Sequence, residues 1–128
     1  VLWINDSKAT NVAAAARAVD AMVRPFVLIA GSHHKGESYA PLAESLSGRC
    51  RGIVAYGEAQ DLLARELSDR APVVTVAAFD DAVRRAADLS RSGDAVLLAP
   101  ACSSYDQFAS FEERGERFRF LVEERCGR

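Results

Sequence analysis

The sequence predicts an α/β domain in which a mostly parallel sheet forms the middle of three layers, with helices on both faces. Short, continuously apolar runs alternate along the chain with segments in which apolar residues recur every three or four positions. The apolar runs show no alternation with polar residues, which is typical of strands buried on both faces of a parallel sheet. Runs of this kind, each followed by a helical period, indicate a repeated β-α unit and a Rossmann-like architecture.

Five strands are predicted from these runs. A glycine directly follows the second and the third run, and Gly93-Asp94 turns the chain into the fifth. Parallel neighbours require crossover connections, which are expected to be right-handed. In chain order the predicted strands are Val1–Ile4, Pro25–Ala30, Ile53–Tyr56, Val73–Val76 and Ala95–Ala99.

Each strand is followed by a predicted helix with one apolar face. Thr10 or Asn11 is expected to cap the first helix, and Gly48 is expected to end the second. Asp80 and Asp81 lie in the favourable first turn of the fourth. The apolar faces are, in order, Val12, Ala15, Ala16, Val19, Met22 and Val23; Tyr39, Leu42, Ala43 and Leu46; Ala59, Leu62, Leu63 and Leu67; Phe79, Ala82, Val83 and Ala86; and Phe111, Phe118, Leu121 and Val122.

The composition fits one globular domain. The chain has 128 residues, of which 49% are hydrophobic and 27% are charged. A net charge of −2 offers no basic excess for nucleic acid, and no apolar run approaches the ~20 residues of a membrane helix. Cys50, Cys102 and Cys126 lack a metal-binding spacing, which indicates free thiols in a reducing compartment. Because the chain opens on Val1–Ile4 without an initiator methionine, we expect a buried strand there and a domain of a longer protein.

Three polar loops follow predicted strands and are the candidate functional segments. Ligands of open parallel sheets bind at the carboxyl ends of the strands. Polar residues on the helices, such as Arg84-Arg85 and Glu112-Glu113, are expected to form solvated surface instead. The three loops are Asn5–Asn11, Gly31–Gly36 and Pro100–Phe108.

The first loop suggests an anionic ligand. It combines a carboxylate, an ammonium group and hydroxyls in one strand-to-helix turn. Capping of the following helix explains one or two of these residues. It does not explain Lys8, whose charge is unfavourable near the positive end of a helix unless an anion lies beside it.

The other two loops are weighed against metal and nucleophile chemistry. Lys35 lies between glycines but without the spacing of a phosphate loop, so it either meets an anion or belongs to an ordinary polar turn. His33-His34 are expected to be exposed loop residues, since adjacent side chains diverge and no third metal ligand is evident. Cys102 as a nucleophile would need an orienting partner, and a packing role is favoured.

Two runs carry a resemblance to a known family. One is Trp3–Asn11, which reads WINDSKATN, and the other is Leu98–Phe108, which reads LAPACSSYDQF and continues through Phe111–Phe118 as FEERGERF. Together they resemble the C-terminal domain of the Mur ligases, in particular of the members that add D-glutamate. The resemblance covers the whole chain. Other Mur ligases and folylpolyglutamate synthase share the fold but differ after the first strand.

The resemblance implies a cytoplasmic, ATP-dependent ligase of peptidoglycan biosynthesis. In the family, ATP with Mg²⁺ phosphorylates the carboxylate of UDP-N-acetylmuramoyl-L-alanine, and the amine of D-glutamate attacks the acyl phosphate. Residues 1–128 would form the D-glutamate-holding domain. The family's central ATPase domain, its expected partner, and its N-terminal UDP-binding domain are absent from the chain. No catalytic residue and no metal ligand is therefore assigned, and the isolated chain is expected to be inactive.

The resemblance also implies binding residues. Two lysines would neutralise the carboxylates of D-glutamate, two hydroxyls would hydrogen-bond them and two aromatic residues would shape the pocket: Lys8 and Lys35, Thr10 and Ser104, and Tyr105 and Phe111. Asp6 would help to hold the ATP end. The middle loop departs from the family, because Ser32 replaces the second of two glycines, and this departure puts the loop's flexibility in doubt.

Two alternatives from other classes remain. A receiver-like or ligand-sensing module would need acidic residues after the first and third strands and a lysine after the fifth. Asp6 fits loosely, whereas Tyr56-Gly57-Glu58 and Ala99-Pro100 fit poorly. A dinucleotide-binding domain is disfavoured because no GxGxxG follows the first strand.

Overall fold

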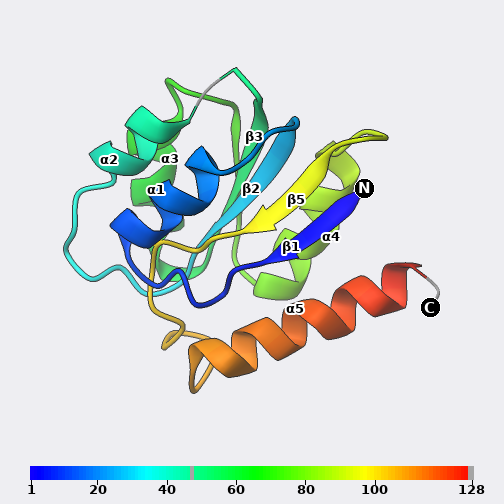
Figure 1. Cartoon of the computed structure of the whole chain (residues 1–128). Helices are drawn as coiled ribbons and strands as arrows, with labels where there is room; N and C mark the ends of the chain where they lie inside the picture. Colours follow the sequence, from blue (N-terminus) through cyan, green and yellow to red (C-terminus); the bar gives the residue numbers. More distant parts are fainter. Residues whose placement is uncertain (47, 127–128) are drawn as a thin grey trace.

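The computed structural model describes residues 1–46 and 48–126 of the chain. Its centre is a five-stranded sheet in which every strand is parallel to its neighbours, in the order β1-β5-β2-β3-β4 (Figure 1). The predicted fold class is confirmed, and the sheet is entirely parallel. The strands are β1 (Leu2–Asn5), β2 (Phe26–Gly31), β3 (Cys50–Tyr56), β4 (Val73–Val76) and β5 (Ala95–Leu98).

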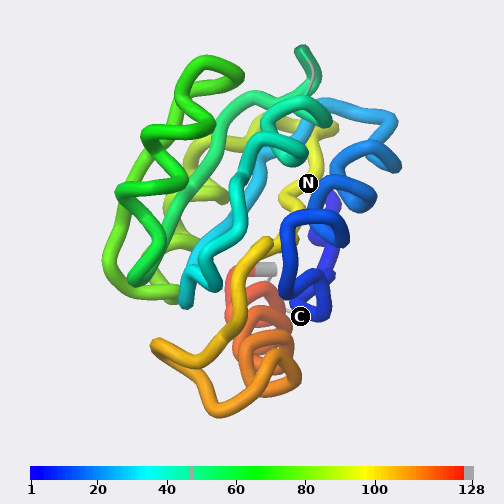
Figure 2. Tube along the Cα trace, turned by 90° about the vertical axis from the view of Figure 1, so that its left-hand side faces the viewer, coloured from blue at the N-terminus to red at the C-terminus, as the bar shows by residue number. Residues whose placement is uncertain are grey.

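Helices cover both faces of the sheet (Figure 1). Their buried residues pack against it in two apolar cores, one on each face. The long connection that follows β5 loops beneath the sheet before it enters the last helix (Figure 2). A short 3-10 helix, η1 (Gly57–Ala59), joins β3 to the third helix. On one face lie α1 (Val12–Asp20), α2 (Ala40–Ser45) and α3 (Gln60–Leu67), and on the other lie α4 (Phe79–Leu89) and α5 (Phe111–Cys126).

The middle of the sheet is fully buried, whereas its edges are not. Every residue of β2 and β5 is buried. In β1, Leu2 is 46% exposed, and Val1 before it is 54% exposed. The prediction of a buried first strand is therefore wrong, because β1 lies at the sheet edge and pairs with a neighbour on one side only.

The predicted element boundaries are close to the observed ones. β4 begins and ends as predicted, β3 begins earlier, at Cys50, and β5 ends at Leu98. The second helix ends at Ser45, before the predicted stop at Gly48. Val23 was expected on the apolar face of the first helix, but it lies beyond α1 and is 89% exposed.

The caps of α1 and α5 set where the two helices begin near the polar loops. Asn11, one of the two predicted caps, accepts a hydrogen bond on Oδ1 from the Ala14 amide at 2.8 Å. At α5, the Ser110 hydroxyl accepts from the Glu113 amide at 3.1 Å, and the Glu113 carboxylate accepts from the Ala109 amide at 3.0 Å. Glu113 is exposed, as predicted for solvated surface, and in addition it helps to cap α5 in an arrangement similar to a capping box.

The cysteines whose side chains are described are free, and none of the described helices is suited to span a membrane. Cys50 and Cys102 are buried free thiols, as predicted. The side chain of Cys126 lies outside the described part of the chain. Among the described residues, no helix is long and apolar enough to cross a membrane.

Candidate functional site

The strand order brings the three polar loops together. β5 lies between β1 and β2, so the carboxyl ends of these three strands are neighbours. The loop after β5 is hydrogen-bonded to both flanking loops, because the Ala101 amide donates to the Ala9 carbonyl and the Gly31 amide donates to the Pro100 carbonyl, both at 3.0 Å. The loops therefore form one surface at the edge where ligands of parallel sheets bind.

One cavity of about 300 Å³ opens among these loops and is called here the hydroxyl cavity. It takes one residue from the loop after β1, one from the loop after β2, three from the loop after β5 and the first residue of α5. The lining includes five of the six residues predicted to bind D-glutamate and adds Ser103. Its residues are Thr10, Lys35, Ser103, Ser104, Tyr105 and Phe111.

The polar side chains of the hydroxyl cavity have hydrogen-bonding capacity to spare. Within residues 1–46 and 48–126, the Lys35 ammonium and the Thr10 and Ser104 hydroxyls make no hydrogen bond or ion pair. Ser103 Oγ is buried and has no partner either. A lysine and several hydroxyls that converge without internal partners can bind an anionic oxygen ligand such as a carboxylate.

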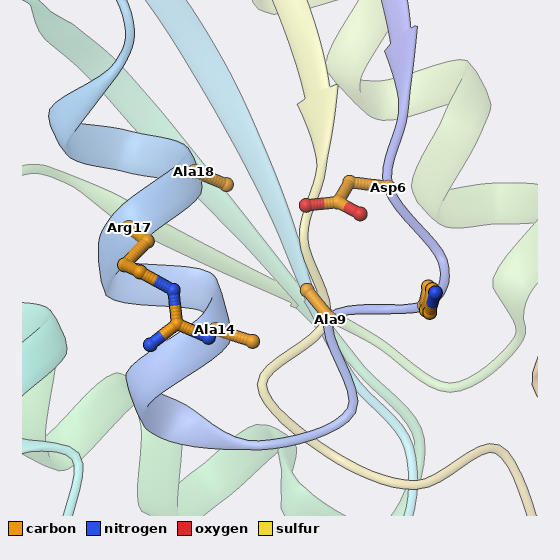
Figure 3. Close-up of a pocket in the computed structure, with 6 residues that line it drawn as sticks. Asp6, Ala9, Ala14, Arg17 and Ala18 are labelled. Atoms are coloured by element: carbon orange, nitrogen blue, oxygen red, sulfur yellow. The ribbon is translucent and has the colours of Figure 1, made fainter.

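A second cavity, of about 460 Å³, lies between the loop after β1 and helix α1 and is called here the charged cavity. Asp6 on the loop and Arg17 on α1 lie on opposite sides of it (Figure 3). Lys8 lines this cavity and not the hydroxyl cavity, so the structure separates it from the other predicted D-glutamate residues. The lining residues are Asp6, Lys8, Ala9, Ala14, Arg17 and Ala18.

A buried arginine that the sequence analysis did not single out holds the loops in place. Arg114 on α5 is 0% exposed. Its guanidinium donates to the Ser7 hydroxyl and the Ser7 carbonyl at 3.0 Å each, to the Cys102 carbonyl at 3.2 Å and to the Tyr56 hydroxyl at 3.3 Å. Arg114 thus links the loop after β1, the end of β3 and the loop after β5. Arg114 belongs to the FEERGERF run that carries the family resemblance, but the sequence predicted no role for it.

Tyr56 and Gly115 show how tightly this arginine is enclosed. Burial raises the pKa of the Tyr56 hydroxyl to about 12, although the neighbouring Arg114 charge lowers it. A Cβ at Gly115 would lie 3.3 Å from the Cβ of Ser7, a tight contact that would require a shift of a few tenths of an ångström. The Ser7 hydroxyl also donates to the Phe111 carbonyl at 2.7 Å.

The loop after β2 begins with two residues in glycine-like conformations. Gly31 has φ +144°, and a Cβ there would lie 2.1 Å from the Tyr56 carbonyl oxygen. Ser32 has φ 99°, and its hydroxyl donates to the Asp106 carboxylate. Asp106 also accepts from the Glu58 amide at 2.8 Å. Ser32 therefore keeps a backbone that glycine adopts freely, and its hydroxyl fastens the loop to the β5 loop.

The two histidines of this loop contact different elements. His33 Nδ1 lies 2.8 Å from a Glu58 carboxylate oxygen, and His34 Nδ1 lies 2.9 Å from the Tyr39 hydroxyl. Both are loop residues, as predicted, but they are only partly exposed, because each ring contacts a partner. Within the described residues there is no cluster of three or more His, Cys, Asp or Glu side chains that could hold a metal ion.

Cys102 is placed as a packing residue. It is 1% exposed, and its Sγ lies 3.0 Å from the Tyr39 hydroxyl. Burial raises the pKa of the Cys102 thiol to about 11, and the Tyr39 hydrogen bond and the Arg114 and Lys35 charges lower it only in part. The thiol is therefore protonated at neutral pH, which weighs against a nucleophilic role.

The sequence comparisons identify the family. Residues 1–102 match the family model described as Mur ligase, glutamate ligase domain. The chain belongs to the Mur ligase family. This finding decides against the receiver-like and dinucleotide-binding alternatives.

Three curated relatives of this Mur ligase domain share one name. UDP-N-acetylmuramoylalanine–D-glutamate ligase of Anaeromyxobacter dehalogenans is 49% identical over 98% of the chain and 28% of the relative. The enzymes of the same name from Myxococcus xanthus and Pseudomonas aeruginosa are each 46% identical, over 96% and 97% of the chain and 27% and 29% of the relatives. The chain therefore spans less than a third of the length of these relatives.

A solved structure supports the fold. A domain from a proposed UDP-N-acetylmuramate:L-alanyl-gamma-D-glutamyl-diaminopimelate ligase of Haemophilus ducreyi matches with a TM-score of 0.52. The match covers 88% of the chain and 85% of that domain at 16% sequence identity. At this identity the likeness supports the Mur ligase domain fold and nothing further.

Proposed function

We propose that this chain is the D-glutamate-holding domain of an ATP-dependent ligase that joins D-glutamate to UDP-N-acetylmuramoyl-L-alanine. The observation that carries the proposal is the hydroxyl cavity, where Lys35, Thr10 and Ser104 converge and have no hydrogen-bond or ion-pair partner within the described part of the chain. The names of the curated relatives supply the substrate.

The hydroxyl cavity suits one end of D-glutamate, a small dianion of carboxylates. Lys35 supplies a positive charge, and Thr10 and Ser104 supply hydroxyl donors, so that a carboxylate oxygen would gain charge-assisted hydrogen bonds. Phe111 and the 71% exposed Tyr105 add aromatic surface for the aliphatic part of the ligand. We assign Thr10, Lys35, Ser104, Tyr105 and Phe111 to this ligand.

The charged cavity suits the ATP side of the reaction. Asp6 was assigned there, and Lys8 lines the same cavity together with Arg17. Two cations beside one carboxylate fit a phosphate-bearing ligand better than they fit an amino acid. We therefore move Lys8 from the D-glutamate residues to the ATP side. We assign no Mg²⁺ ligand to the described residues, since they contain no suitable cluster.

The chemistry requires the domain to orient one nucleophile. The D-glutamate amine attacks the carbonyl carbon of the acyl phosphate, the amide C–N bond forms, and phosphate leaves. Attack needs the amine within about 3.5 Å of that carbon, and exclusion of water protects the acyl phosphate from hydrolysis. Holding the carboxylates of D-glutamate aims the amine. The central and N-terminal domains would bind ATP and the UDP-linked precursor, so the isolated chain is expected to be inactive.

The proposal is tested in the full-length protein with Lys35→Ala and Ser104→Ala. Each removes one partner of a ligand carboxylate, so we expect the KM for D-glutamate to rise about tenfold or more. The matched control is Arg119→Ala, on the exposed side of α5, which is expected to leave the kinetics unchanged. Unchanged D-glutamate kinetics in both test variants would overturn the site assignment, and precursor-dependent ADP release by residues 1–128 alone would overturn the expected inactivity.

A further inference from the structure

A continuous chain of three hydrogen-bonding side chains connects the loop after β2 to the loop after β5. His34 Nδ1 lies 2.9 Å from the Tyr39 hydroxyl, and that hydroxyl lies 3.0 Å from Cys102 Sγ. We propose that His34 and Tyr39 are positioning residues, which hold the loop after β2 against the β5 loop and so place Lys35 at the hydroxyl cavity. This inference rests on the proposed function and adds two residues to it.

Burial makes the chain more than a surface contact. Tyr39 and Cys102 are each 1% exposed, so the Tyr39 hydroxyl has no access to bulk water as an alternative partner. Burial also raises the pKa of Tyr39, which keeps its hydroxyl protonated. A hydroxyl can donate one hydrogen bond and accept others, so His34 and Cys102 together satisfy both of its functions. Loss of either partner would leave the buried hydroxyl with one hydrogen bond in place of two.

The anchor lies immediately before Lys35 in the chain. The backbone of His33 is bridged to Ser103, with the His33 amide donating to the Ser103 carbonyl at 3.0 Å and the Ser103 amide donating back at 3.2 Å. The side chain of His34 makes the next attachment, through Tyr39. Two successive residues are thus fastened to the β5 loop, and Lys35 is the first residue beyond them. Lys35 is followed by Gly36, which has φ +88°. A Cβ added at Gly36 would have open space around it.

An anchored loop reduces the unfavourable free energy of ordering the loop when the ligand binds. Lysine is a flexible side chain whose immobilisation is unfavourable, and a mobile backbone beneath it would add to this cost. Because the anchor acts through Lys35, its loss should weaken the affinity for D-glutamate and leave the ATP side unaffected. The expected effect of losing one buried hydrogen bond is about a fivefold rise in KM.

The test uses the full-length protein and four variants. Tyr39→Phe removes the shared hydroxyl and keeps the ring, and His34→Ala removes the outer partner. His34→Gln restores a side chain that can donate and accept, and should recover most of the lost affinity. His33→Ala is the matched control, because the contact of its side chain with Glu58 is exposed and its bridge to Ser103 uses only the backbone.

We expect Tyr39→Phe and His34→Ala to raise the KM for D-glutamate about fivefold, with kcat and the KM for ATP unchanged. An unchanged KM for D-glutamate, or an equal rise in the KM for ATP, would overturn the inference. If Lys35→Ala raises the KM and these two variants do not, this inference fails while the proposed function stands. If Lys35→Ala also has no effect, the proposed function fails first. If Tyr39→Phe folds poorly, His34→Ala still tests the inference, because His34 is partly exposed and its loss disturbs the core less.

Discussion

The two cavities on either side of the loop after β1 differ in the chemistry that they present. The charged cavity combines Asp6, Lys8 and Arg17, with alanines between them. The hydroxyl cavity has a single cation, Lys35, among hydroxyl and aromatic side chains. Both cavities take residues from one short loop, since Lys8 faces the first and Thr10 faces the second, with the buried Ala9 between them.

The difference shows how one loop can serve two ligands. The loop is a turn, in which the Ala9 amide donates to the Asp6 carbonyl at 2.9 Å and the Thr10 amide donates to the Lys8 carbonyl at 2.8 Å, so residues two apart can line separate cavities. A charged cavity with two cations is suited to phosphate groups, whereas one cation with hydroxyls is suited to a carboxylate. The loop is therefore the natural boundary between the ATP side and the D-glutamate side of the proposed ligase.

The largest effect is expected from breaking both cavities at once. Arg114→Leu removes a fully buried cation and its four hydrogen bonds, one of which is donated to the Tyr56 hydroxyl. We expect the free energy of unfolding to fall by about 3 kcal/mol, measured by equilibrium urea denaturation of residues 1–128. Arg119→Leu, on the exposed side of the same helix, is the control. A loss below about 1 kcal/mol would contradict the linking role of Arg114.

The second prediction separates the two cavities by function. Lys8→Ala removes a cation from the charged cavity only, so in the full-length protein we expect the KM for ATP to rise about tenfold and the KM for D-glutamate to stay within about twofold. Lys35→Ala should show the reverse pattern. The same pattern for both lysines would mean that the loop after β1 does not divide the ligands.

The third prediction concerns a buried carboxylate remote from both cavities. Asp94 precedes β5 at the opposite end of the sheet and accepts from Arg51 Nε at 2.5 Å and from the Arg91 amide at 2.8 Å. The Arg51 hydrogen bond holds the pKa of Asp94 below its ordinary value, despite burial. We expect Asp94→Asn to cost about 2 kcal/mol at pH 7.

The sign of the pH dependence follows from the lowered pKa. A carboxylate with a lowered folded-state pKa contributes stability above its ordinary pKa, and that contribution is lost as the pH falls through the lowered value. The difference in unfolding free energy between the parent chain and Asp94→Asn should therefore shrink below about pH 4. Urea denaturation between pH 7 and pH 3 measures it. A difference that grows on acidification would contradict the assignment, and the kinetics of the full-length variant at pH 7 should remain those of the parent.

The smallest effect is expected at Ser103, in the wall of the hydroxyl cavity. Its hydroxyl is buried and has no hydrogen-bond partner among the residues that the structure describes. Ser103→Ala therefore removes an unsatisfied polar atom, and we expect the unfolding free energy to change by less than about 1 kcal/mol. An unchanged KM for D-glutamate would leave Thr10, Lys35 and Ser104 as the polar contacts. A clear rise would add Ser103 to them.

Much of the fold and part of the site were predictable from local patterns. Continuous apolar runs gave the parallel sheet, because such strands are buried on both faces. Polar residues after those runs marked the loops, and five of the six residues predicted for D-glutamate do line one cavity. Arg114 was missed because a charged residue in a charged helix looks solvated until the packing around it is known. Val1–Ile4 was wrongly predicted as buried because an apolar run does not reveal an edge position.

The sequence by itself determined the α/β class, the order of the elements, and the loop residues that carry the family resemblance. Only the tertiary structure decided that β5 lies between β1 and β2, so that residues from three loops share a wall. It also assigned Lys8 and Thr10 to different cavities and joined His34 to Cys102 through Tyr39. The reason is physical: propensity and periodicity act over a few residues, whereas strand order and side-chain direction depend on contacts between residues far apart in the chain.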